Sequence, residues 1–508
     1  MVSPVEVVVH GERISIAEVE RVARHGARVQ LGPAALQNLE RSRQALERAI
    51  AEGEVIYGVN TGFGSLARKR LDGDQLREVQ KNLILSHAAG VGDLLPDEVV
   101  RAMWLLLVAS LARGLSGVRP IVAERVVALL NAGVTPRVPS VGSVGASGDL
   151  APLAHAALVL LGEGEANFAS GCANGKEVLA QLGLEPLVLE AKEGLALVNG
   201  THLMAAQGAL FFADVERLVA AALCASAMSI DACRGTDAFL DARVHAARGQ
   251  LGQQEVAERV ARLIRGSQIV PSHLHDDPRV QDPYSLRCVP QVVGAALDLL
   301  GFSRSLIERE LGAVSDNPLV FGDEQARAVV SAGNFHGMPL AIALDTAVLA
   351  LTHIAGISER RVYYILAASD AQNPLNPHLS PVPGLHSGLM IAQYVAAACC
   401  NELVGLTPPA SAANFPTSAG MEDYNSFGAT SAMKARRALS RATDVIAIEL
   451  LCAAEALEYQ RPLRSGDGVE RAYDAVRSVV SRRTADRPPA PDIAAIRELI
   501  QAGVFAGP

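Results

Sequence analysis

The stretch from Leu203 to Cys233, LMAAQGALFFADVERLVAAALCASAMSIDAC, decides the fold class of this chain. Its apolar residues fall on nearly every face of a helix, and a helix of that kind lies in the middle of a bundle. Residues 340–367 and 436–459 have the same character. Strand-like pieces, such as 5–9 and 187–190, are too few for an alternating β-α-β plan. The pattern predicts a mainly α protein with a central bundle of long helices.

Composition supports helices and argues against several partner classes. Half of the 508 residues are hydrophobic but only 4% are aromatic, which favours closely packed, alanine-rich helices. The 45 Lys and Arg and 54 Asp and Glu give a net charge of −9, which argues against nucleic acid or an anionic membrane as the main partner. The longest apolar runs, about 102–112 and 388–400, are shorter than the ~20 residues that span a bilayer.

The N-terminus and the cysteines indicate a cytoplasmic protein. Residues 1–6 lack the charged-then-apolar order of a signal peptide. Seven cysteines, spread from Cys172 to Cys452 without a C-x-x-C motif, are typical of a reduced chain. We therefore expect free thiols and a cytoplasmic location.

The most unusual segment is Gly142-Ser-Val-Gly-Ala-Ser-Gly-Asp149, which small residues dominate. Asp149 is a good N-cap for a helix that starts here, with Pro152 in the first turn and Gly162 at the end. A Gly-rich turn into a helix is the simplest interpretation. A nucleophilic serine fits poorly because the spacing is not G-x-S-x-G, and a phosphate loop fits poorly because no Gly-Lys-Ser/Thr follows.

The central residues Ala146, Ser147 and Gly148 also permit an internal reaction. In a tight turn the Gly148 nitrogen can attack the Ala146 carbonyl carbon. Loss of two waters, which takes away the Ser147 hydroxyl, leaves a five-membered ring with an exocyclic methylene. That ring is a strong electrophile of a kind that ordinary side chains do not supply. The positive end of the following helix favours negative charge that develops on it.

The run from Gly142 to His155 resembles the signature of the aromatic amino acid ammonia-lyases, which carry this ring as the methylidene-imidazolone (MIO) group. Further blocks of that family occur in the family's order: Tyr57-Gly-Val-Asn-Thr-Gly-Phe-Gly64, Ser86-His-Ala-Ala-Gly90, Glu193-Gly-Leu-Ala-Leu-Val-Asn-Gly-Thr201, Gln281-Asp-Pro-Tyr-Ser-Leu-Arg287, Gly333-Asn-Phe-His-Gly337 and Glu422-Asp423. Together these blocks are very specific. Within the family, the chain looks most like the members that act on histidine.

The resemblance assigns roles to single residues. It makes Tyr57 the base that removes the β-proton and places Tyr284 beside the MIO ring. It makes Arg287 the ligand of the substrate carboxylate, which a guanidinium binds well through two parallel hydrogen bonds. The remaining pocket residues, of which the first and last would receive an imidazole, are His87, Asn199, Gln281, Phe335 and Glu422.

Local patterns add two expectations about these residues and one about metals. Gln281, Tyr284 and Arg287 would share one helical face if their block is helical, and Asn199 stands at an apparent helix start. The run His273-Leu-His-Asp-Asp277 has the residue types of a metal site, but no second ligand group stands out. We expect no metal and no external cofactor, because the electrophile is made from the chain itself.

Four positions depart from the histidine-specific pattern, namely His202, Met338, Met421 and Tyr424. Two polar-to-Met changes make the pocket more tolerant of a phenyl or phenol ring. Conversion of L-histidine to trans-urocanate and ammonia is the leading hypothesis. A tyrosine or phenylalanine ammonia-lyase or 2,3-aminomutase with the same MIO group stays open as the alternative. A catalytically dead scaffold is disfavoured by the intact Ala-Ser-Gly run.

The resemblance also implies an architecture and an assembly. It implies a fold of the fumarase/aspartase-like lyase superfamily, with one functional unit over 1–508. In that unit a part to about 200 carries the MIO loop, about 201–480 forms the long-helix bundle, and 481–508 is a tail. It further implies a homotetramer whose active sites combine residues from more than one subunit, with a small amino acid as the substrate.

Overall fold

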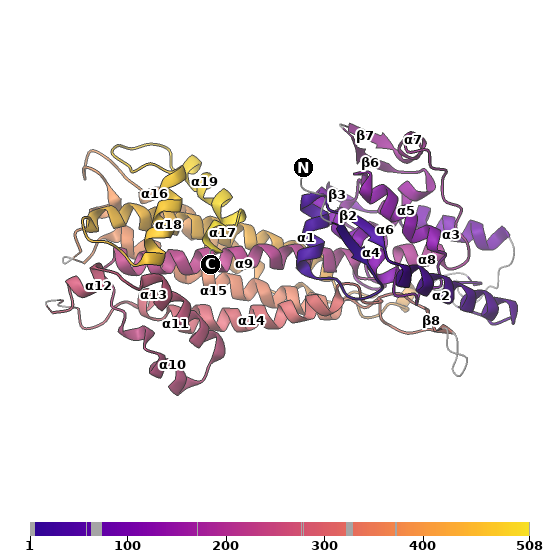
Figure 1. Cartoon of the computed structure of the whole chain (residues 1–508), viewed down its shortest axis with the longest axis horizontal. Helices are drawn as coiled ribbons and strands as arrows, with labels where there is room; N and C mark the ends of the chain where they lie inside the picture. Colours follow the sequence, from indigo (N-terminus) through magenta and orange to yellow (C-terminus); the bar gives the residue numbers. More distant parts are fainter. Residues whose placement is uncertain are drawn as a thin grey trace. The chain divides into compact units, whose positions relative to one another are not determined.

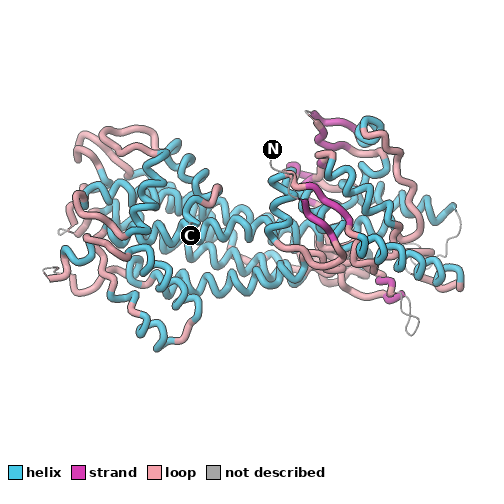
Figure 2. Tube along the Cα trace, viewed as in Figure 1, coloured by secondary structure: helices cyan, strands magenta, loops and turns pink. Residues whose placement is uncertain are grey.

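The computed structural model describes residues 6–56, 58–61, 74–169, 171–275, 277, 279–321, 329–370 and 373–506. Helices account for most of these residues and the strands are short (Figure 2), so the predicted mainly α fold is confirmed. Packing divides the chain into two compact units. Unit 1 comprises Met1–Ala213, Arg304–Asp345 and Pro409–Met433, and unit 2 comprises Asp214–Ser303, Thr346–Pro408 and Lys434–Pro508. The single functional unit over 1–508 stays a prediction.

Three long helices occupy the stretches that the apolar pattern indicated (Figure 1). They are α9 (His202–Ala232), α15 (Met338–Ala367) and α17 (Gly428–Leu457). The predicted start of the last helix, at residue 436, was too late. Its first turns contain mostly small and polar residues, which show no apolar pattern. The existence of a long helix was therefore predictable, but the position of its first residue was not.

In unit 2 these three helices pack around a buried charge. Ser229 of α9 and Ser358 of α15 donate hydrogen bonds to the carboxylate of Glu449 in α17, at 2.7 and 2.5 Å. Arg361 of α15 pairs with the same carboxylate through Nε at 2.5 Å and Nη2 at 2.8 Å. All four side chains are buried. Because a buried charge needs a partner and hydrogen bonds, this cluster fixes how the three helices pack.

Unit 1 begins with β1 (Glu6–Val9) and β2 (Arg28–Leu31), a parallel pair on either side of α1 (Ile16–His25). Helix α1 starts where a capping box forms between Ser15 and Glu18, and it ends at Gly26 with φ of 66°. The core helix is α4 (Asp97–Leu111), which is buried on nearly every face and packs against α1 and α5 (Pro120–Asn131).

The other elements of unit 1 surround this core. Helix α6 (Leu150–Leu158), which starts after the 146–148 turn, continues as a 3-10 turn to Leu161. Gly162 ends it as predicted. The strand predicted at 187–190 is wrong. That segment is irregular: the amide N–H of Leu187 donates a hydrogen bond to Leu160 O, and Val188 O accepts one from the Arg119 side chain.

The remaining helices of unit 1 are α2 (Pro33–Ala51), α3 (Asp74–His87), α6 (Leu150–Leu158), α7 (Gly175–Gln181) and α8 (Glu193–Val198). The antiparallel strands are β3 (Val91–Leu94) with β5 (Pro139–Val141), β4 (Thr135–Pro136) with β6 (Glu165–Phe168) and β7 (Gly171–Asn174), and β8 (Leu319–Val320) with β9 (Val329–Val330).

The named regular elements among the described residues of unit 2 are all helices, joined by irregular segments. Its final helix, α19 (Ala490–Gln501), begins directly after Pro488 and Pro489. The helices of this unit, besides the long ones, are α10 (Ala242–Arg248), α11 (Leu251–Ile264), α12 (Ile269–Ser272), α13 (Tyr284–Arg287), α16 (Met390–Leu406), α18 (Asp467–Val479) and α19 (Ala490–Gln501); α14 (Val289–Glu310) begins here and ends in unit 1.

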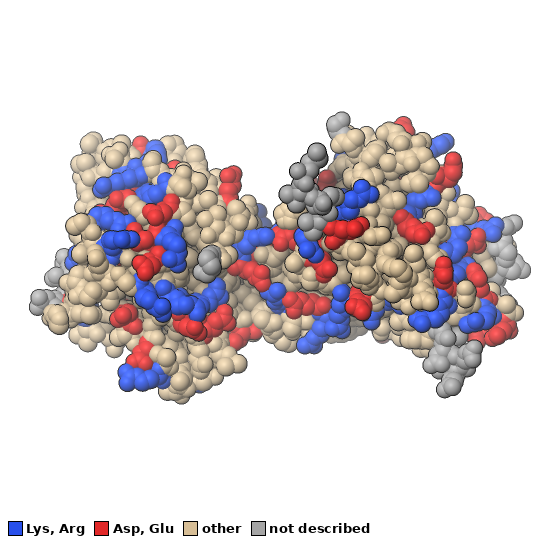
Figure 3. Space-filling view, in the orientation of Figure 1, with Lys and Arg blue, Asp and Glu red and all other residues tan. Residues whose placement is uncertain are grey.

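Among the residues that the structure describes, two helices are long and apolar enough to cross a membrane by length and composition alone, which the apolar runs of the sequence did not indicate. They are α15, with mean hydropathy 1.9, and Met390–Ala412, with mean hydropathy 1.2. The apolar window of α15 is 61% buried inside the chain, as in a core helix, whereas that of Met390–Ala412 is 22% buried. Basic and acidic side chains are interspersed on the face that Figure 3 shows.

Candidate active site

The 146–148 turn is held in unit 1 by the segment that leads into α17. The amide N–H of Phe427 donates to Val144 O at 2.9 Å, and the hydroxyl of Ser426 donates to Gly145 O at 3.2 Å. Gly145 has φ of 69°, and a Cβ there would lie 2.0 Å from Ser426 Oγ. Only glycine therefore fits at this position without a shift of its neighbour.

The other side of the turn is held by Gly200. Its amide N–H donates to Ser147 O at 3.2 Å, and its carbonyl oxygen accepts from the amide N–H of Asp149 at 2.7 Å. Gly148 has φ of 73°, and a Cβ there would lie 2.0 Å from Gly200 O. Ala146 and Gly148 are buried, while Ser147 is partly exposed. The small residues therefore allow Ser426 on one side and Gly200 on the other to approach the backbone of the turn closely, as the sequence indicated.

Asp149 does not cap the helix that follows it, so its predicted role is wrong. It stands at the N-cap position of α6 but makes no capping bond there. Its carboxylate accepts instead from the amide N–H groups of Leu203 at 2.9 Å and Met204 at 3.0 Å, in the first turn of α9, and from Ser143 Oγ at 2.8 Å. Burial raises the pKa of Asp149 to about 6, against the effect of these hydrogen bonds. The buried carboxyl thus ties the 146–148 turn to α9.

Asn199 follows the last residue of α8 rather than starting a helix, which corrects the sequence expectation. Its amide NH₂ donates to Asp316 Oδ1 at 3.1 Å and to Asn317 O at 3.3 Å. Asp316 in turn pairs with Lys192 Nζ at 2.5 Å, and both of these side chains are buried. Asn199 Oδ1 is buried without a hydrogen-bond partner among the described residues. The network therefore leaves this oxygen as an acceptor beside Gly200.

Three more predicted residues lie in unit 1. His87 is the last residue of α3, half-buried, with Nδ1 3.1 Å from Ser86 Oγ. Glu422 accepts a hydrogen bond from Thr417 Oγ1 at 2.7 Å, and no cation pairs with it among the described residues. Phe335 is partly exposed, so it is not a core residue of this chain. Between these three and the 146–148 turn the described residues show no hydrogen bond or ion pair.

Gln281, Tyr284 and Arg287 come together in unit 2. Arg287 Nη2 donates to Gln281 Oε1 at 2.8 Å, and its guanidinium lies 4.8 Å from the centroid of the Tyr284 ring. Tyr284 and Arg287 begin and end the single helical turn α13, while Gln281 precedes it. The prediction that Gln281 shares a helical face with Tyr284 and Arg287 is thus wrong, because Gln281 lies before the helix. Gln281 still contacts Arg287, because both side chains are long enough to reach each other.

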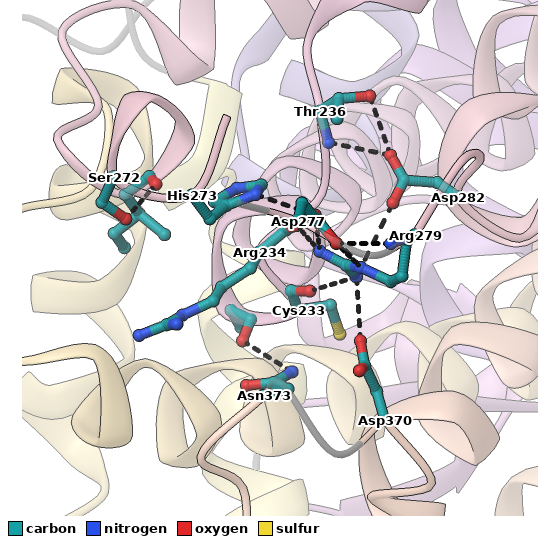
Figure 4. A network of polar contacts seen from close by, with 12 residues as sticks. Cys233, Arg234, Thr236, Ser272, His273, Asp277, Arg279, Asp282, Asp370 and Asn373 are labelled. Carbon is teal, nitrogen blue, oxygen red and sulfur yellow. Dashed lines mark hydrogen bonds and ion pairs between the residues drawn. The ribbon is translucent and has the colours of Figure 1, made fainter. Parts of the chain in front are cut away.

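A cleft of about 580 Å³ opens beside these side chains. Two arginines line it, but only one is free to bind an anion. Arg279 faces three carboxylates, as Figure 4 shows, while Arg287 has no carboxylate partner among the described residues. The residues that line the cleft are Arg279, Gln281, Asp282, Pro283, Tyr284, Arg287, Tyr364, Ser369 and Asp370.

The histidine-rich run at 273–277 forms a hydrogen bond between two of its own side chains. His273 Nδ1 lies 3.0 Å from Asp277 Oδ2, and Asp277 also accepts from Arg279. Among the described residues no group of three or more His, Cys, Asp and Glu side chains is arranged to hold a metal. Asp276 lies outside the described residues. The carboxylate beside His273 is therefore engaged by a guanidinium.

The four departures from the family pattern have different surroundings. His202 is buried at the start of α9, and burial lowers its pKa to about 4, so its imidazole is neutral near pH 7. Met338 is partly exposed at the start of α15. Met421 and Tyr424 are 69% and 63% exposed. The last two side chains therefore contribute to the surface of this chain, where a ligand or another protein surface can reach them.

The predicted residues fall into two groups, one in each unit. Unit 1 holds His87, Ala146, Ser147, Gly148, Asn199, Phe335 and Glu422, and unit 2 holds Gln281, Tyr284 and Arg287. Tyr57 lies outside the described residues. Sequence reasoning missed Lys192, Asp316 and Arg279. Arg279 had a local signal, the acidic residues just before it, which were weighed only as metal ligands.

A family model described as aromatic amino acid lyase matches residues 14–478. This chain belongs to the aromatic amino acid lyase family. As a member of that family it is an enzyme, and its long-helix architecture is that of the family. The match covers the blocks on which the resemblance rested, including the 146–148 turn and the Gln281-to-Arg287 segment.

Individual relatives match over nearly their whole length. The histidine ammonia-lyase of Anaeromyxobacter dehalogenans is 47% identical, with 97% of this chain and 98% of that protein covered. The histidine ammonia-lyase of Geobacillus thermodenitrificans is 44% identical, with 96% of each covered. Among solved lyase-family structures, histidine ammonia-lyase from Trypanosoma cruzi is 36% identical with a TM-score of 0.91, covering 98% of this chain and 94% of that one. Tyrosine aminomutase from Streptomyces globisporus is 35% identical with a TM-score of 0.92, covering 99% and 98%.

Proposed function

We propose that this chain is a histidine ammonia-lyase that converts L-histidine to trans-urocanate and ammonia through an MIO group. The observation that carries the proposal is the tightly held 146–148 turn, in a chain whose relatives at 44–47% identity are named histidine ammonia-lyases. A turn of this kind places the Gly148 amide where it can approach the Ala146 carbonyl.

The residues of the turn fit an MIO group. Glycine at 145 and 148 permits the two close approaches, and the amide N–H of Gly148 makes no hydrogen bond among the described residues. No hydrogen bond among the described residues therefore keeps the Gly148 nitrogen away from the Ala146 carbonyl carbon. When formed, the group supplies an electrophile that activates the substrate. It is made from the chain, so we expect no external cofactor.

Arg287 is proposed to bind the substrate carboxylate. Its guanidinium makes hydrogen bonds only with neutral oxygens among the described residues, Asp282 O at 2.9 Å and Gln281 Oε1 at 2.8 Å. A cation without a charged partner, at the edge of a cleft, binds a carboxylate more strongly than one already neutralised. Gln281 and Tyr284 line the same cleft and are proposed to contact the substrate and the MIO ring.

The remaining roles follow the family resemblance. Tyr57 is proposed to remove the β-proton, and close positioning of this base contributes to the rate. His87 and Glu422 are proposed to receive the imidazole, since a half-buried imidazole and a carboxylate that pairs with no cation among the described residues can exchange hydrogen bonds with it. Asn199 offers its buried acceptor oxygen next to the turn. Phe335 is proposed as an aromatic wall.

We further propose a cytoplasmic homotetramer whose active sites combine residues of several subunits. Exposed apolar side chains on α15 and α16 support an association between copies, since large exposed apolar patches mark interaction surfaces. These side chains are Leu349, Tyr363, Ile391, Tyr394, Val395 and Val404. The hydrogen bond from Gln393 Nε2 to Glu359 Oε1, at 2.8 Å, places the two helices side by side.

The rival function is a tyrosine or phenylalanine ammonia-lyase or 2,3-aminomutase with the same MIO group. The exposed Met421 and Tyr424 favour it, because these residues depart from the histidine pattern and suit a less polar ring. The similarity to tyrosine aminomutase, at 35% identity, points in the same direction. Relatives at 44–47% identity favour histidine.

One substrate panel separates these functions. The full-length protein is incubated with L-histidine, L-tyrosine and L-phenylalanine separately, while near-UV absorbance and ammonia are followed. Urocanate and ammonia from histidine alone support the proposal. Coumarate, cinnamate or a β-amino acid from the other substrates establishes the rival. The Ser147→Ala variant is the matched control, since it cannot form the MIO group and should give no product.

A further inference from the structure

Arg279 is the hub of a network in unit 2 that contacts the segment carrying Gln281 and Arg287. Its Nε lies 3.1 Å from Asp277 Oδ1, and its Nη2 lies 2.8 Å from Asp277 Oδ2. Its Nη1 lies 3.1 Å from Asp370 Oδ2, and it faces Asp282 Oδ1 at 3.7 Å. Figure 4 shows the guanidinium among these three carboxylates, which come from two separate segments. Removing the cation would leave three negative charges close together.

The same guanidinium also binds the end of α9. Nη1 donates to Cys233 O at 3.0 Å, and Nη2 donates to Arg234 O. These carbonyl groups follow Ala232, the last residue of α9, and carbonyl groups at a helix C-terminus favour a nearby cation. Burial alone would lower the pKa of Arg279, but the hydrogen bond with Asp277 and the charges around it outweigh burial and raise the pKa. Arg279 therefore keeps its charge and has no capacity left for a substrate carboxylate.

Asp282 links Arg279 to Arg287, because it contacts both side chains. Its Oδ1 faces Arg279, while its Oδ2 accepts from the amide N–H of Thr236 at 2.8 Å and from Thr236 Oγ1 at 2.9 Å. The carbonyl oxygen of the same residue accepts from Arg287 Nε at 2.9 Å. A shift of the residue 282 backbone would therefore move a hydrogen-bond acceptor that orients Arg287.

We propose that Arg279 is a positioning residue that clamps the 279–287 segment to α9 and to Asp370, so that Arg287 stays directed into the cleft. This inference rests on the proposed function in taking Arg287 as the ligand of the substrate carboxylate. It goes beyond that function by assigning a task to a side chain whose charge is already balanced by carboxylates of the chain itself. The planar guanidinium is needed because its Nε, Nη1 and Nη2 each bond a different carboxylate or carbonyl oxygen here, whereas an ammonium has only three N–H donors on a single nitrogen and no planar fork.

The first test is kinetic. Arg279→Lys keeps the charge and loses the forked geometry, so we expect KM for L-histidine to rise about tenfold with kcat changed less than about threefold, because substrate binding is weakened rather than the chemical step. Arg262→Lys is the matched control. Arg262 forms an exposed pair with Glu258 within α11, and its replacement should leave both constants unchanged. An unchanged KM in Arg279→Lys overturns the proposal.

A double-variant cycle separates positioning from a general loss of stability. If Arg279 acts through Arg287, Arg279→Lys should raise KM no further once Arg287→Gln has removed the guanidinium. An equal rise in both backgrounds overturns the proposal, because the effect would then be independent of Arg287. If Arg279→Lys does not fold, Asp370→Asn removes one arm of the clamp, and the same cycle is run with it.

Hydrogen exchange keeps the test independent of the enzyme activity. The amide N–H groups of Leu286 and Arg287 donate to Pro283 O at 3.0 and 3.1 Å, and that of Cys288 donates to Tyr284 O at 2.8 Å. We expect these amides to exchange faster in Arg279→Lys and at the wild-type rate in Arg262→Lys. This measurement needs no turnover, so it distinguishes failure of the clamp from failure of the proposed function. Unchanged exchange in Arg279→Lys overturns the clamp even in an active enzyme.

Discussion

Gly145→Ala tests whether the 146–148 turn depends on close contact with the segment before α17. Alanine at φ of 69° costs about 1–2 kcal/mol because its Cβ crowds the backbone. The new Cβ would also lie 2.0 Å from Ser426 Oγ, and overpacking of this kind costs about 1–3 kcal/mol. We therefore expect Gly145→Ala to lower the free energy of unfolding by about 2–5 kcal/mol and to reduce the fraction of chains with a dehydrated turn.

Two other variants separate the two costs. Gly249 has φ of 75° with open space around its Cβ position, so Gly249→Ala should show only the backbone cost of about 1–2 kcal/mol. Ser426→Ala loses the hydrogen bond to Gly145 O, which is worth about 1 kcal/mol. In the Gly145→Ala/Ser426→Ala double variant the close contact with Oγ is gone. The double variant should therefore be about 1–3 kcal/mol more stable than the sum of the single effects.

The assay is urea denaturation at one fixed protein concentration, because the proposed association between copies would make apparent stability depend on concentration. The mass of the peptide that carries residues 146–148 is measured on the same preparations. The reasoning is refuted if Gly145→Ala and Gly249→Ala lose the same stability within about 0.5 kcal/mol. It is also refuted if the Ser426→Ala change gives no recovery in the double variant.

Three further predictions concern the 146–148 turn and two buried charged groups. Ser147→Ala should abolish turnover because the turn can no longer form the MIO group, and the variant should still fold, since residue 147 is partly exposed and the change introduces no larger side chain; a variant that fails to fold, or one that still releases urocanate, would contradict this. Because burial raises the pKa of Asp149 from 3.8 to about 6, the folded state holds its proton more tightly, and this group's contribution should lower wild-type stability by about 3 kcal/mol as pH rises from about 4 to about 6. Asp149→Asn should remove that component, so equal pH slopes for the two proteins would be the contrary result. Arg361→Met should cost about 3–5 kcal/mol because it leaves Glu449 charged and buried, and adding Glu449→Leu should restore part of the loss; urea midpoints that fall further in the double variant would count against a buried pair.

The long helices were predictable because a helix that is buried on most faces needs apolar residues along its whole length. A helix such as α9 is apolar on nearly all faces, and a sequence that meets this condition over about 30 residues has few other structures open to it. Helix ends depend on single contacts and were not predictable in the same way. The first turn of α17 shows this, since small and polar residues there carry no periodic signal.

The sequence indicated which residues lie at the candidate site, but it did not indicate which other residue each of them contacts. An aspartate before a helix predicts an N-cap, yet Asp149 bonds to α9, with its partner Leu203 54 residues further along the chain. Asn199 likewise depends on Asp316, 117 residues away. Contacts between distant segments are set by packing of the whole unit, for which local patterns hold no information. The acidic residues before Arg279 gave a local signal for a cation there, but its contacts with Asp370 and the end of α9 come from distant segments and were not predictable.

The proposed activity of this chain depends on conversion of the 146–148 turn to an MIO group. The most direct measurement is the mass of the peptide that carries Ala146, Ser147 and Gly148, taken from the purified, folded, full-length protein. We predict a mass lower than that of the encoded peptide by two waters, and an unchanged mass in Ser147→Ala. A wild-type peptide of full encoded mass, in a preparation that still releases urocanate from L-histidine, would contradict the account.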